Sequence, residues 1–157
     1  MSGGHDGAGM RSGVRSAGDL LARPVRLHGI ALGRPVDLFL DRDDLRPVGL
    51  DVLCGDEEHR FLPLAAATLD DAGIAIASPL VLLEEAQLDF YRSRTFSLSS
   101  LRGRPVRRRD VEIGLLKDLR LAADLTPSTV VVEVDGRERE LPFDGSIRFD
   151  RRSRSAA

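Results

Sequence analysis

The sequence predicts an all-β protein made of two tandem small β-barrels, joined by a linker that can form a short helix. Two observations predict this class. The chain matches itself after a shift of 81 positions, and each matching half consists of short β-rich runs with turn residues about every ten positions. The 157 residues suffice for one ordinary domain or two very small ones, and the 42% hydrophobic content can supply a core.

The internal match is the strongest pattern in the chain. It aligns 20–55 with 101–136 without a gap, and 11 of the 36 aligned positions are identical. Composition alone would give roughly two or three identities. Several unlike pairs stay apolar, namely Ile30 with Val111, Leu32 with Ile113, Leu50 with Val131 and Leu53 with Val134. We interpret the match as an internal duplication.

The duplication divides the chain into five segments. The first repeat covers 20–83, the second, abbreviated repeat covers 96–149, and 84–95 is the linker. Residues 1–19 and 150–157 are polar and rich in Gly, Ser or Arg. We expect them to be disordered tails because they can bury little apolar surface.

Short strands are predicted along the first repeat, where apolar and β-branched runs alternate with Gly, Asp and Pro. They are Pro24–Leu27, Val36–Leu40, Val48–Cys54, His59–Leu64 and Ile74–Ala77. A helix over Pro79–Arg92 follows, with Ser78 as its cap and Leu83 and Phe90 on its apolar face. Residues 81–83 can instead be the last strand of the repeat, and the sequence leaves both alternatives open.

The second repeat contains the clearest hairpin. Thr129–Val134 and Arg137–Phe143 flank Asp135-Gly136, a pair suited to the positive φ angles of a two-residue turn. Gly33 and Gly114 precede the Asp-Leu-x-Leu strand of each repeat, and we expect them at a turn or a bulge.

Both repeats contain the pattern Val-x7-Gly-x3-Asp-Leu-x-Leu, which resembles the beginning of a PRC-barrel domain. The residues that carry it are Val25, Gly33, Asp37, Leu38 and Leu40, and then Val106, Gly114, Asp118, Leu119 and Leu121. That family continues with a strand, a turn and a strand ending in Leu-Pro or Ile-Pro, as both repeats do. The second repeat departs from the pattern, because only four residues lie between Pro142 and Ile147, where ten lie between Pro63 and Ile74.

The resemblance implies small barrels and an adaptor role. The family includes the cytoplasmic part of the photosynthetic reaction-centre H subunit, the C-terminal domain of RimM-type ribosome maturation factors, and small standalone bacterial and archaeal proteins. Its shared theme is docking onto a larger protein or ribonucleoprotein particle, without catalytic residues in the module. The chain lacks the separate N-terminal barrel of the maturation factors, so their specific role is not implied.

The sequence suggests no catalytic residue, metal site or cofactor site. His5, His28 and His59 lack metal-site spacing, and Cys54 ends an apolar strand, where a buried, unreactive thiol is expected. Several acids cluster in the turn after Leu40, where Asp is favoured by its hydrogen bonds to the turn backbone. The recurrence of Asp37 as Asp118 indicates fold maintenance, since two copies would hardly share one active site.

The strongest charge feature is a segment with five arginines in eight residues. The candidate partner-binding residues are Arg102, Arg104, Arg107, Arg108 and Arg109. Their guanidinium groups could bind phosphates or an acidic protein face. The acidic region Asp41–Glu58 could instead compensate them within the molecule or across a dimer, and both alternatives stay open.

We therefore expect a non-enzymatic cytoplasmic adaptor that binds a protein or ribonucleoprotein partner. The alternative is a homodimeric module that binds a small molecule or ion without catalysis. A formal charge of −2, one Tyr and no Trp give direct nucleic-acid contact only weak support. No apolar run is long enough to span a membrane, and a single cysteine excludes an intramolecular disulfide and fits a reducing cytoplasm.

Overall fold

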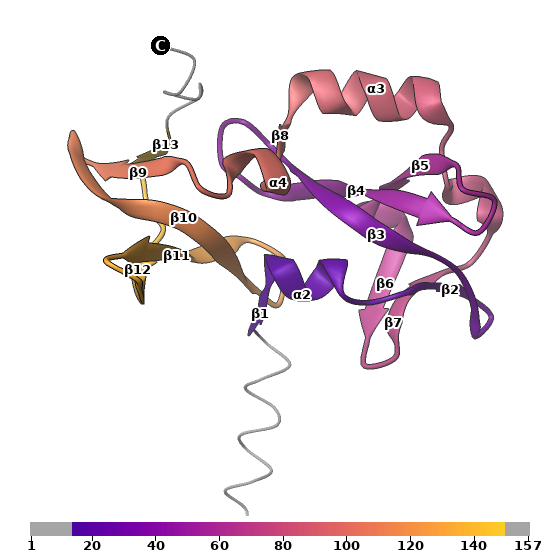
Figure 1. Ribbon diagram of the computed structural model, residues 1–157. Coiled ribbons are helices and arrows are strands. Elements are labelled where there is room, and N and C mark those ends of the chain that lie inside the picture. Colours follow the sequence, from indigo (N-terminus) through magenta and orange to yellow (C-terminus); the bar gives the residue numbers. More distant parts are fainter. Residues whose placement is uncertain (1–13, 150–157) are drawn as a thin grey trace, which may run out of the picture. The chain divides into compact units, whose positions relative to one another are not determined.

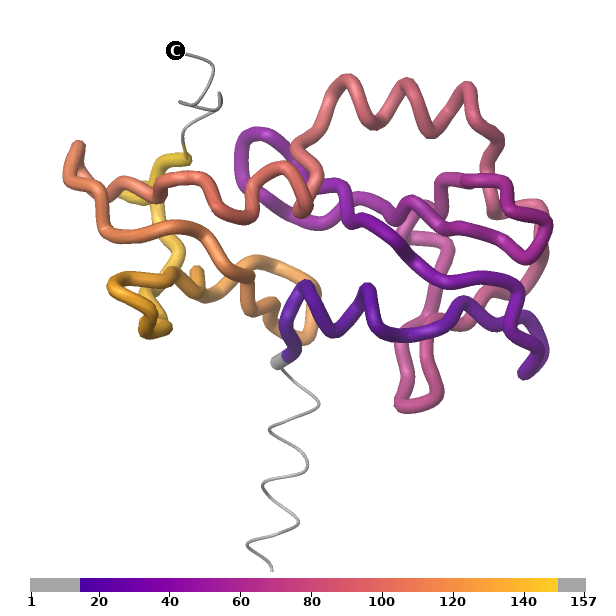
Figure 2. The backbone as a smooth tube through the Cα atoms, viewed as in Figure 1, coloured from indigo at the N-terminus to yellow at the C-terminus, as the bar shows by residue number. Residues whose placement is uncertain are grey.

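The computed structural model describes residues 14–149 (Figures 1 and 2). Most of them lie in β-strands, which confirms the predicted all-β class. They form two compact units. The N-terminal unit consists of 17–99, and the C-terminal unit combines 14–16 with 100–149. None of the helices among these residues is long and apolar enough to cross a membrane.

The N-terminal unit contains one seven-stranded sheet with the order β5-β4-β3-β2-β7-β6, and β8 pairs with β3. Its strands are β2 (Val25–Leu27), β3 (Ile30–Leu40), β4 (Pro47–Cys54), β5 (His59–Pro63), β6 (Ala67–Asp70), β7 (Gly73–Ile76) and β8 (Phe96–Ser97). β2 and β7 are parallel, and the other pairs are antiparallel. The sheet curls, and Figure 1 shows β6 and β7 running across the direction of β3 and β4. Its end strands, β5 and β6, form no ladder with each other among the described residues, so the sheet is an open half-barrel.

Both faces of this sheet are buried at its centre. Leu38, Leu50 and Leu62 lie opposite one another on β3, β4 and β5, and all three are fully buried. Phe39 and Phe61 point to the other face and pack beneath the helix α3 (Glu85–Arg94). Burial on both faces explains why these strands contain nearly continuous apolar runs.

The helical segment begins later than predicted. Ser78 is a cap, because its Oγ accepts a backbone N–H at 3.1 Å, but it caps only the 3-10 helix η2 (Pro79–Val81). Leu83 then bridges to Phe61 on β5, and α3 begins two residues further on. The alternative of one helix from Pro79 was therefore wrong, and the alternative of a last strand over 81–83 is reduced to one bridge, in which Leu83 joins the edge of the sheet. Phe90, expected on the buried face of the helix, is 50% exposed.

The C-terminal unit contains a six-stranded antiparallel sheet with the order β12-β11-β10-β9-β13, and β1 pairs with β10. Its strands are β1 (Val14–Ser16), β9 (Pro105–Arg108), β10 (Val111–Ala122), β11 (Pro127–Val134), β12 (Arg137–Pro142) and β13 (Ile147–Phe149). The hairpin predicted at Asp135-Gly136 is confirmed, with φ angles of 52° and 78°. β13 lies antiparallel beside β9, whereas β7 lies parallel beside β2 in the N-terminal unit.

Two short strands pair at matching positions. β1 precedes the first repeat in the sequence but pairs with β10, which belongs to the second. β8 lies at the start of the second repeat, before the matched stretch 101–136, but pairs with β3, which belongs to the first. Ser16 lies opposite Arg120 and Ser97 lies opposite Phe39, so the two pairings differ by the same 81 positions.

The N-terminal tail predicted through Asp19 is too long. Val14–Ser16 is β1, and the helix α2 (Ala17–Leu21) follows, with Ala17 and Leu20 fully buried. So short a polar segment carries no strand signal, because its pairing partner lies far away in the sequence. Residues 1–13 and 150–157, the rest of the predicted tails, lie outside the described residues.

The turns after the two long strands differ in length. Six residues, 41–46, separate the last paired residues of β3 and β4, and five residues, 122–126, separate those of β10 and β11. Positions beyond these turns therefore correspond at a shift of 80. Val130, and not Val131, takes the place of Leu50 in the sheet, so the ungapped alignment is wrong beyond this point.

Candidate partner-binding surface

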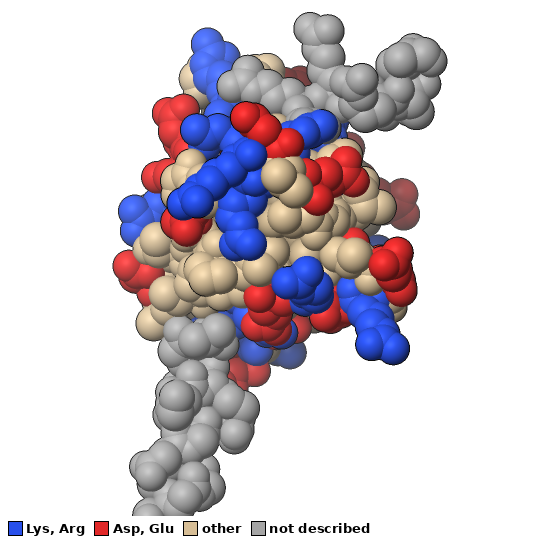
Figure 3. Space-filling model, turned by 90° about the vertical axis from the view of Figure 1, so that its left-hand side faces the viewer, with Lys and Arg blue, Asp and Glu red and all other residues tan. Residues whose placement is uncertain are grey.

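The predicted arginines lie in the C-terminal unit, along the approach to β9 and on the β9–β10 hairpin. Figure 3 views the molecule from the left-hand side of Figure 1, where this hairpin lies. Lys and Arg side chains gather in the upper part of this view, with Asp and Glu side chains among them and an uncharged area below. The five arginines have different surroundings, and each has to be considered separately.

Arg102 and Arg104 hold the start of β9. Arg102 Nε donates to the Lys117 carbonyl at 3.1 Å, and its Nη2 lies 3.8 Å from Asp118 Oδ1. Arg104 is half-buried, and its backbone N–H and carbonyl are both hydrogen-bonded. The side-chain contacts give Arg102 a structural role within the unit, and the backbone of Arg104 joins the start of β9 to β10.

Arg107 fixes the turn of its hairpin. Its Nη1 donates to the carbonyl of Asp110 in the turn at 3.3 Å. Arg26, which is 81 positions earlier, donates in the same way to the carbonyl of Gly29 at 3.0 Å. The repeated arginine is therefore explained by the turn it holds, and Arg107 is a positioning residue for the hairpin.

Arg108 and Arg109 are the arginines next to the tip of the hairpin, and Arg109 is exposed. Both lie near Asp144 in the loop before β13. The Ser146 hydroxyl and backbone N–H donate to the Asp144 carboxylate and hold its pKa below the usual range, and the two guanidinium groups add a smaller electrostatic effect. An acidic neighbour thus compensates part of the positive charge at the tip.

Val111 adds an apolar side chain to the same tip. It lies opposite Arg108, directly after the turn formed by Arg109 and Asp110, and 62% of it is exposed. Positive φ angles of 53° and 69° at the two turn residues make this a tight turn, so the strands project the tip into solvent. The tip combines cationic and apolar chemistry on a fixed support.

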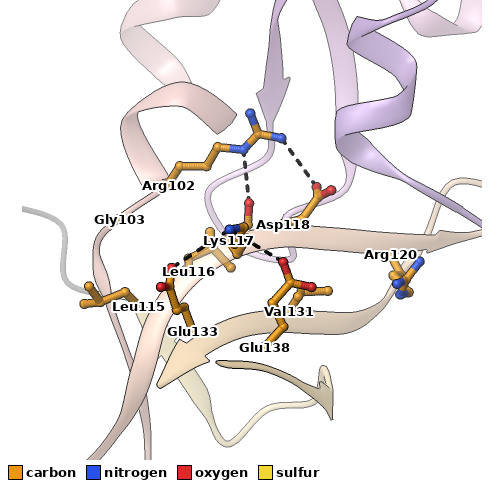
Figure 4. Close-up of a pocket in the computed structure, with 10 residues that line it drawn as sticks. All are labelled: Arg102, Gly103, Leu115, Leu116, Lys117, Asp118, Arg120, Val131, Glu133 and Glu138. Carbon is orange, nitrogen blue, oxygen red and sulfur yellow. Dashed lines mark hydrogen bonds and ion pairs between the residues drawn. The ribbon is translucent and has the colours of Figure 1, made fainter. Parts of the chain in front are cut away.

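A second surface feature of the C-terminal unit is a hollow of about 510 Å³ over β10, β11 and β12 (Figure 4). Its lining includes Val131 and charged side chains of both signs. Lys117 Nζ lies 3.5 Å from Glu138 and 4.0 Å from Glu133. With Arg102 beside Asp118, these cations already have anionic partners inside the hollow.

The corresponding sheet face of the N-terminal unit is covered by α3. There Phe39 and Phe61 lie 5.9 Å apart, and Tyr91 of α3 stacks on Phe61 at 4.1 Å. By strand register, Arg120 occupies in the C-terminal sheet the position that Phe39 has in the N-terminal sheet, and Glu140 occupies that of Phe61. Arg120 and Glu140 form a salt bridge of 2.8 Å. The aromatic pair under the helix is thus replaced by an ion pair where the sheet face is open.

Sequence reasoning missed a buried carboxylate. Asp51 on β4 is 6% exposed, and its Oδ1 lies 2.8 Å from His59 Nδ1 on β5. Its Oδ2 lies 3.5 Å from Nη2 of Arg92 on α3. The contacts link the helix to the sheet, which is a structural role. A lone Asp inside the apolar run Val48–Cys54 was the available signal.

The other residues considered from the sequence have local partners. The Asp37 carboxylate accepts the Leu38 N–H at 2.9 Å, and the Ser99 N–H and hydroxyl at 3.1 and 2.6 Å. Asp118 accepts the Leu119 N–H at 2.8 Å. These contacts agree with the expected role of the repeated Asp in the fold.

The histidines and the cysteine considered from the sequence have the following surroundings. His28 is in the β2–β3 turn with a φ of 51°, His59 contacts Asp51, and His5 lies outside the described residues. Cys54 is buried, as expected. Within 14–149, no group of three His, Cys, Asp or Glu side chains is placed to hold a metal ion.

A scan against protein-family models finds no match, and a search of curated proteins finds no significant match either. What the protein does is therefore inferred from its own residues.

Proposed function

We propose that the chain is a duplicated, PRC-barrel-like, non-enzymatic cytoplasmic adaptor. In this proposal the tip of the β9–β10 hairpin contacts a partner protein, alone or within a ribonucleoprotein. The observation that carries it is the group formed by Arg108, Arg109 and the exposed Val111, on a turn that Arg107 holds. Fixed cations beside an apolar side chain are typical of protein interfaces, in which arginine is enriched.

Repeated contacts support the duplication. Asp37 and Asp118 each accept the next backbone N–H, and Arg26 and Arg107 each bind a turn carbonyl. The two long hairpins and their short preceding strands pair at equivalent positions. Two independently evolved sheets have no reason to share such details.

The mixture of charges favours a protein face over a bare phosphate backbone. Asp110 and Glu112 stand one and three positions after Arg109, and Asp144 lies close to Arg108 and Arg109. Nucleic-acid affinity depends on many uncompensated cations that release counterions. A compensated tip is better suited to a small, specific contact.

The hollow of Figure 4 favours a second candidate, a homodimeric module that binds a small molecule or ion. It is the weaker one, because Lys117 and Arg102 are already paired with Glu138 and Asp118. A ligand would have to break these pairs. Ligand-dependent increases in Tm across a panel of small polar metabolites would favour this candidate.

Charge reversal tests the adaptor proposal. The variant R108E/R109E alters the tip but leaves Arg107 to hold the turn. R137E/R139E on β12 is the matched control, since both arginines are exposed and the formal charge falls by the same amount, from −2 to −6. Tagged wild type and variants would be expressed at native level, and the retained proteins would be quantified by mass spectrometry.

We expect the wild type and R137E/R139E to retain a protein that R108E/R109E does not retain. The Tm of R108E/R109E should equal that of the wild type. Retention of the same proteins by all three would contradict the proposal. If ribonuclease treatment releases other retained proteins while this partner stays bound to the wild type, the partner is the protein part of a ribonucleoprotein.

A further inference from the structure

The two long hairpins carry an exposed apolar residue at the same place. Ile30 is 67% exposed and Val111 is 62% exposed, and each is the first residue of a long strand. Both follow a two-residue turn with two positive φ angles, and in the first hairpin these are 51° at His28 and 82° at Gly29. The positions differ by 81, so they are equivalent in the two repeats.

Burial does not explain why both positions stay apolar. When two copies have diverged to 11 identities in 36 positions, shared apolar positions are normally those that face a core. Ile30 and Val111 face solvent instead. Single exposed apolar residues are ordinary on protein surfaces. Exposed apolar residues at the equivalent positions of two hairpins, however, are explained by a contact that both hairpins make.

Packing within the hairpin does not explain them either. The residue opposite Ile30 is Leu27, whereas the residue opposite Val111 is Arg108. The cross-strand neighbour has thus changed from apolar to cationic, and the exposed β-branched residue has stayed. What the two repeats share at this position is the exposed side chain itself.

An arginine also stands beside each tip. Arg26 and Arg107 hold the turns, and Arg108 and Arg109 add further positive charge at the second tip. A complementary surface would be an apolar pocket with carboxylates at its rim. An exposed β-branched side chain near an arginine at both tips fits one kind of partner site.

We infer that both hairpin tips bind this kind of pocket, so that one chain binds the same partner protein twice. The inference rests on the proposed adaptor function and extends it, because the proposal requires only the β9–β10 tip. A chain with two equivalent contacts bridges two partner molecules, or two like sites on one assembly. Bivalent binding raises the overall affinity above that of each single contact.

Site-specific photo-crosslinking tests the inference. The photoreactive amino acid p-benzoylphenylalanine would replace Ile30 or Val111 in the full chain, expressed in its native host. Leu80, which is 85% exposed and belongs to η2 rather than to either hairpin, is the control position. We expect positions 30 and 111 to crosslink to the same protein and position 80 not to do so.

Stoichiometry gives the second measurement. With the crosslinked partner purified as a single subunit and added in excess, analytical ultracentrifugation should show two partner molecules bound per chain for the wild type. I30E and V111E should each reduce this number to one, and the double variant should show none. Exposed positions are chosen, so the variants should keep the wild-type Tm.

Other results would overturn the inference. These are crosslinks from one tip only, crosslinks to different proteins, a crosslinked second copy of this chain, or equal crosslinking from position 80. Sedimentation with phosphatidylglycerol vesicles that I30E and V111E abolish would assign the tips to a membrane surface. If a partner depends on Arg108 and Arg109 but only position 111 crosslinks, the adaptor proposal stands and the bivalent inference falls.

Discussion

Replacing Phe61 with alanine should strongly destabilise the N-terminal unit, because this ring lies between the sheet and α3. Phe61 is 1% exposed, stacks on Tyr91 at 4.1 Å and contacts Phe39 at 5.9 Å. Truncating a buried Phe costs about 3–5 kcal/mol, and each ring pair contributes roughly 0.5–1.5 kcal/mol of such a loss. With rings on both sides, we expect a loss of about 4 kcal/mol of unfolding free energy.

The equivalent position of the other sheet provides the control. Glu140 takes the place of Phe61 on β12, and its side chain is half-exposed in a salt bridge with Arg120. Exposed salt bridges contribute about 0–1 kcal/mol. Glu140→Ala should therefore cost no more than about 1 kcal/mol, although it is equivalent to Phe61→Ala in register.

The assay uses the fluorescence of a single residue. Tyr91 is the only tyrosine and the chain has no tryptophan, so tyrosine emission during urea unfolding reports on α3 and the sheet beneath it. Far-ultraviolet circular dichroism would follow the strands of both units in parallel. A Phe61→Ala loss below about 1 kcal/mol, or an equal loss in Glu140→Ala, would refute the packing described for this face.

Further variants test other contacts. Gly33→Ala should cost about 1–3 kcal/mol in urea unfolding, because its Cβ would lie 2.6 Å from a β4 carbonyl oxygen, whereas Gly145→Ala, which meets nothing within 4 Å, should be neutral. Asp51→Asn should cost about 1 kcal/mol in the same assay, since it removes the charge shared by β5 and α3. The hydrogen bond from Arg60 lowers the Asp56 pKa from 3.8 to about 2. The pair therefore stabilises the fold fully above pH 4, and this stabilisation is lost as the pH falls towards 2. In a carboxyl NMR titration, Arg60→Gln should raise that pKa towards 3.8, and an unchanged midpoint would contradict the assignment.

The strands could be predicted because their signals are local. Asp135-Gly136 between β-branched runs specifies its own hairpin, whatever the rest of the chain does. The strand Val14–Ser16 was not predictable in this way, since it exists only through pairing with β10. The start of α3 was misplaced because Ser78 and Pro79 are equally good signals for a 3-10 turn.

The composition of the sequence locates the candidate site, but it does not show which of its arginines are available to a partner. A cluster of arginines is visible in the sequence, yet the role of each depends on the group that its guanidinium reaches. Arg107 reaches a turn carbonyl and Arg102 reaches a carbonyl and a carboxylate, so the guanidinium group of each already has a contact within the unit. Arg108 and Arg109 remain as candidates, and the exposure of Val111 beside them was not foreseeable, because apolar alternation alone suggests burial.

Comparison of the two repeats separates residues that hold the fold from residues that differentiate it. Two of the identical pairs have structural explanations, because Asp37 and Asp118 bind the next backbone N–H, and Arg26 and Arg107 bind turn carbonyls. One differing set of positions follows the presence or absence of a covering helix, as an aromatic pair is replaced by an ion pair. Ile30 and Val111 belong to neither class, since they keep their character without burial, a hydrogen bond or a constant neighbour. Selection for burial does not account for them, whereas the proposed contact with a partner explains why both stay apolar.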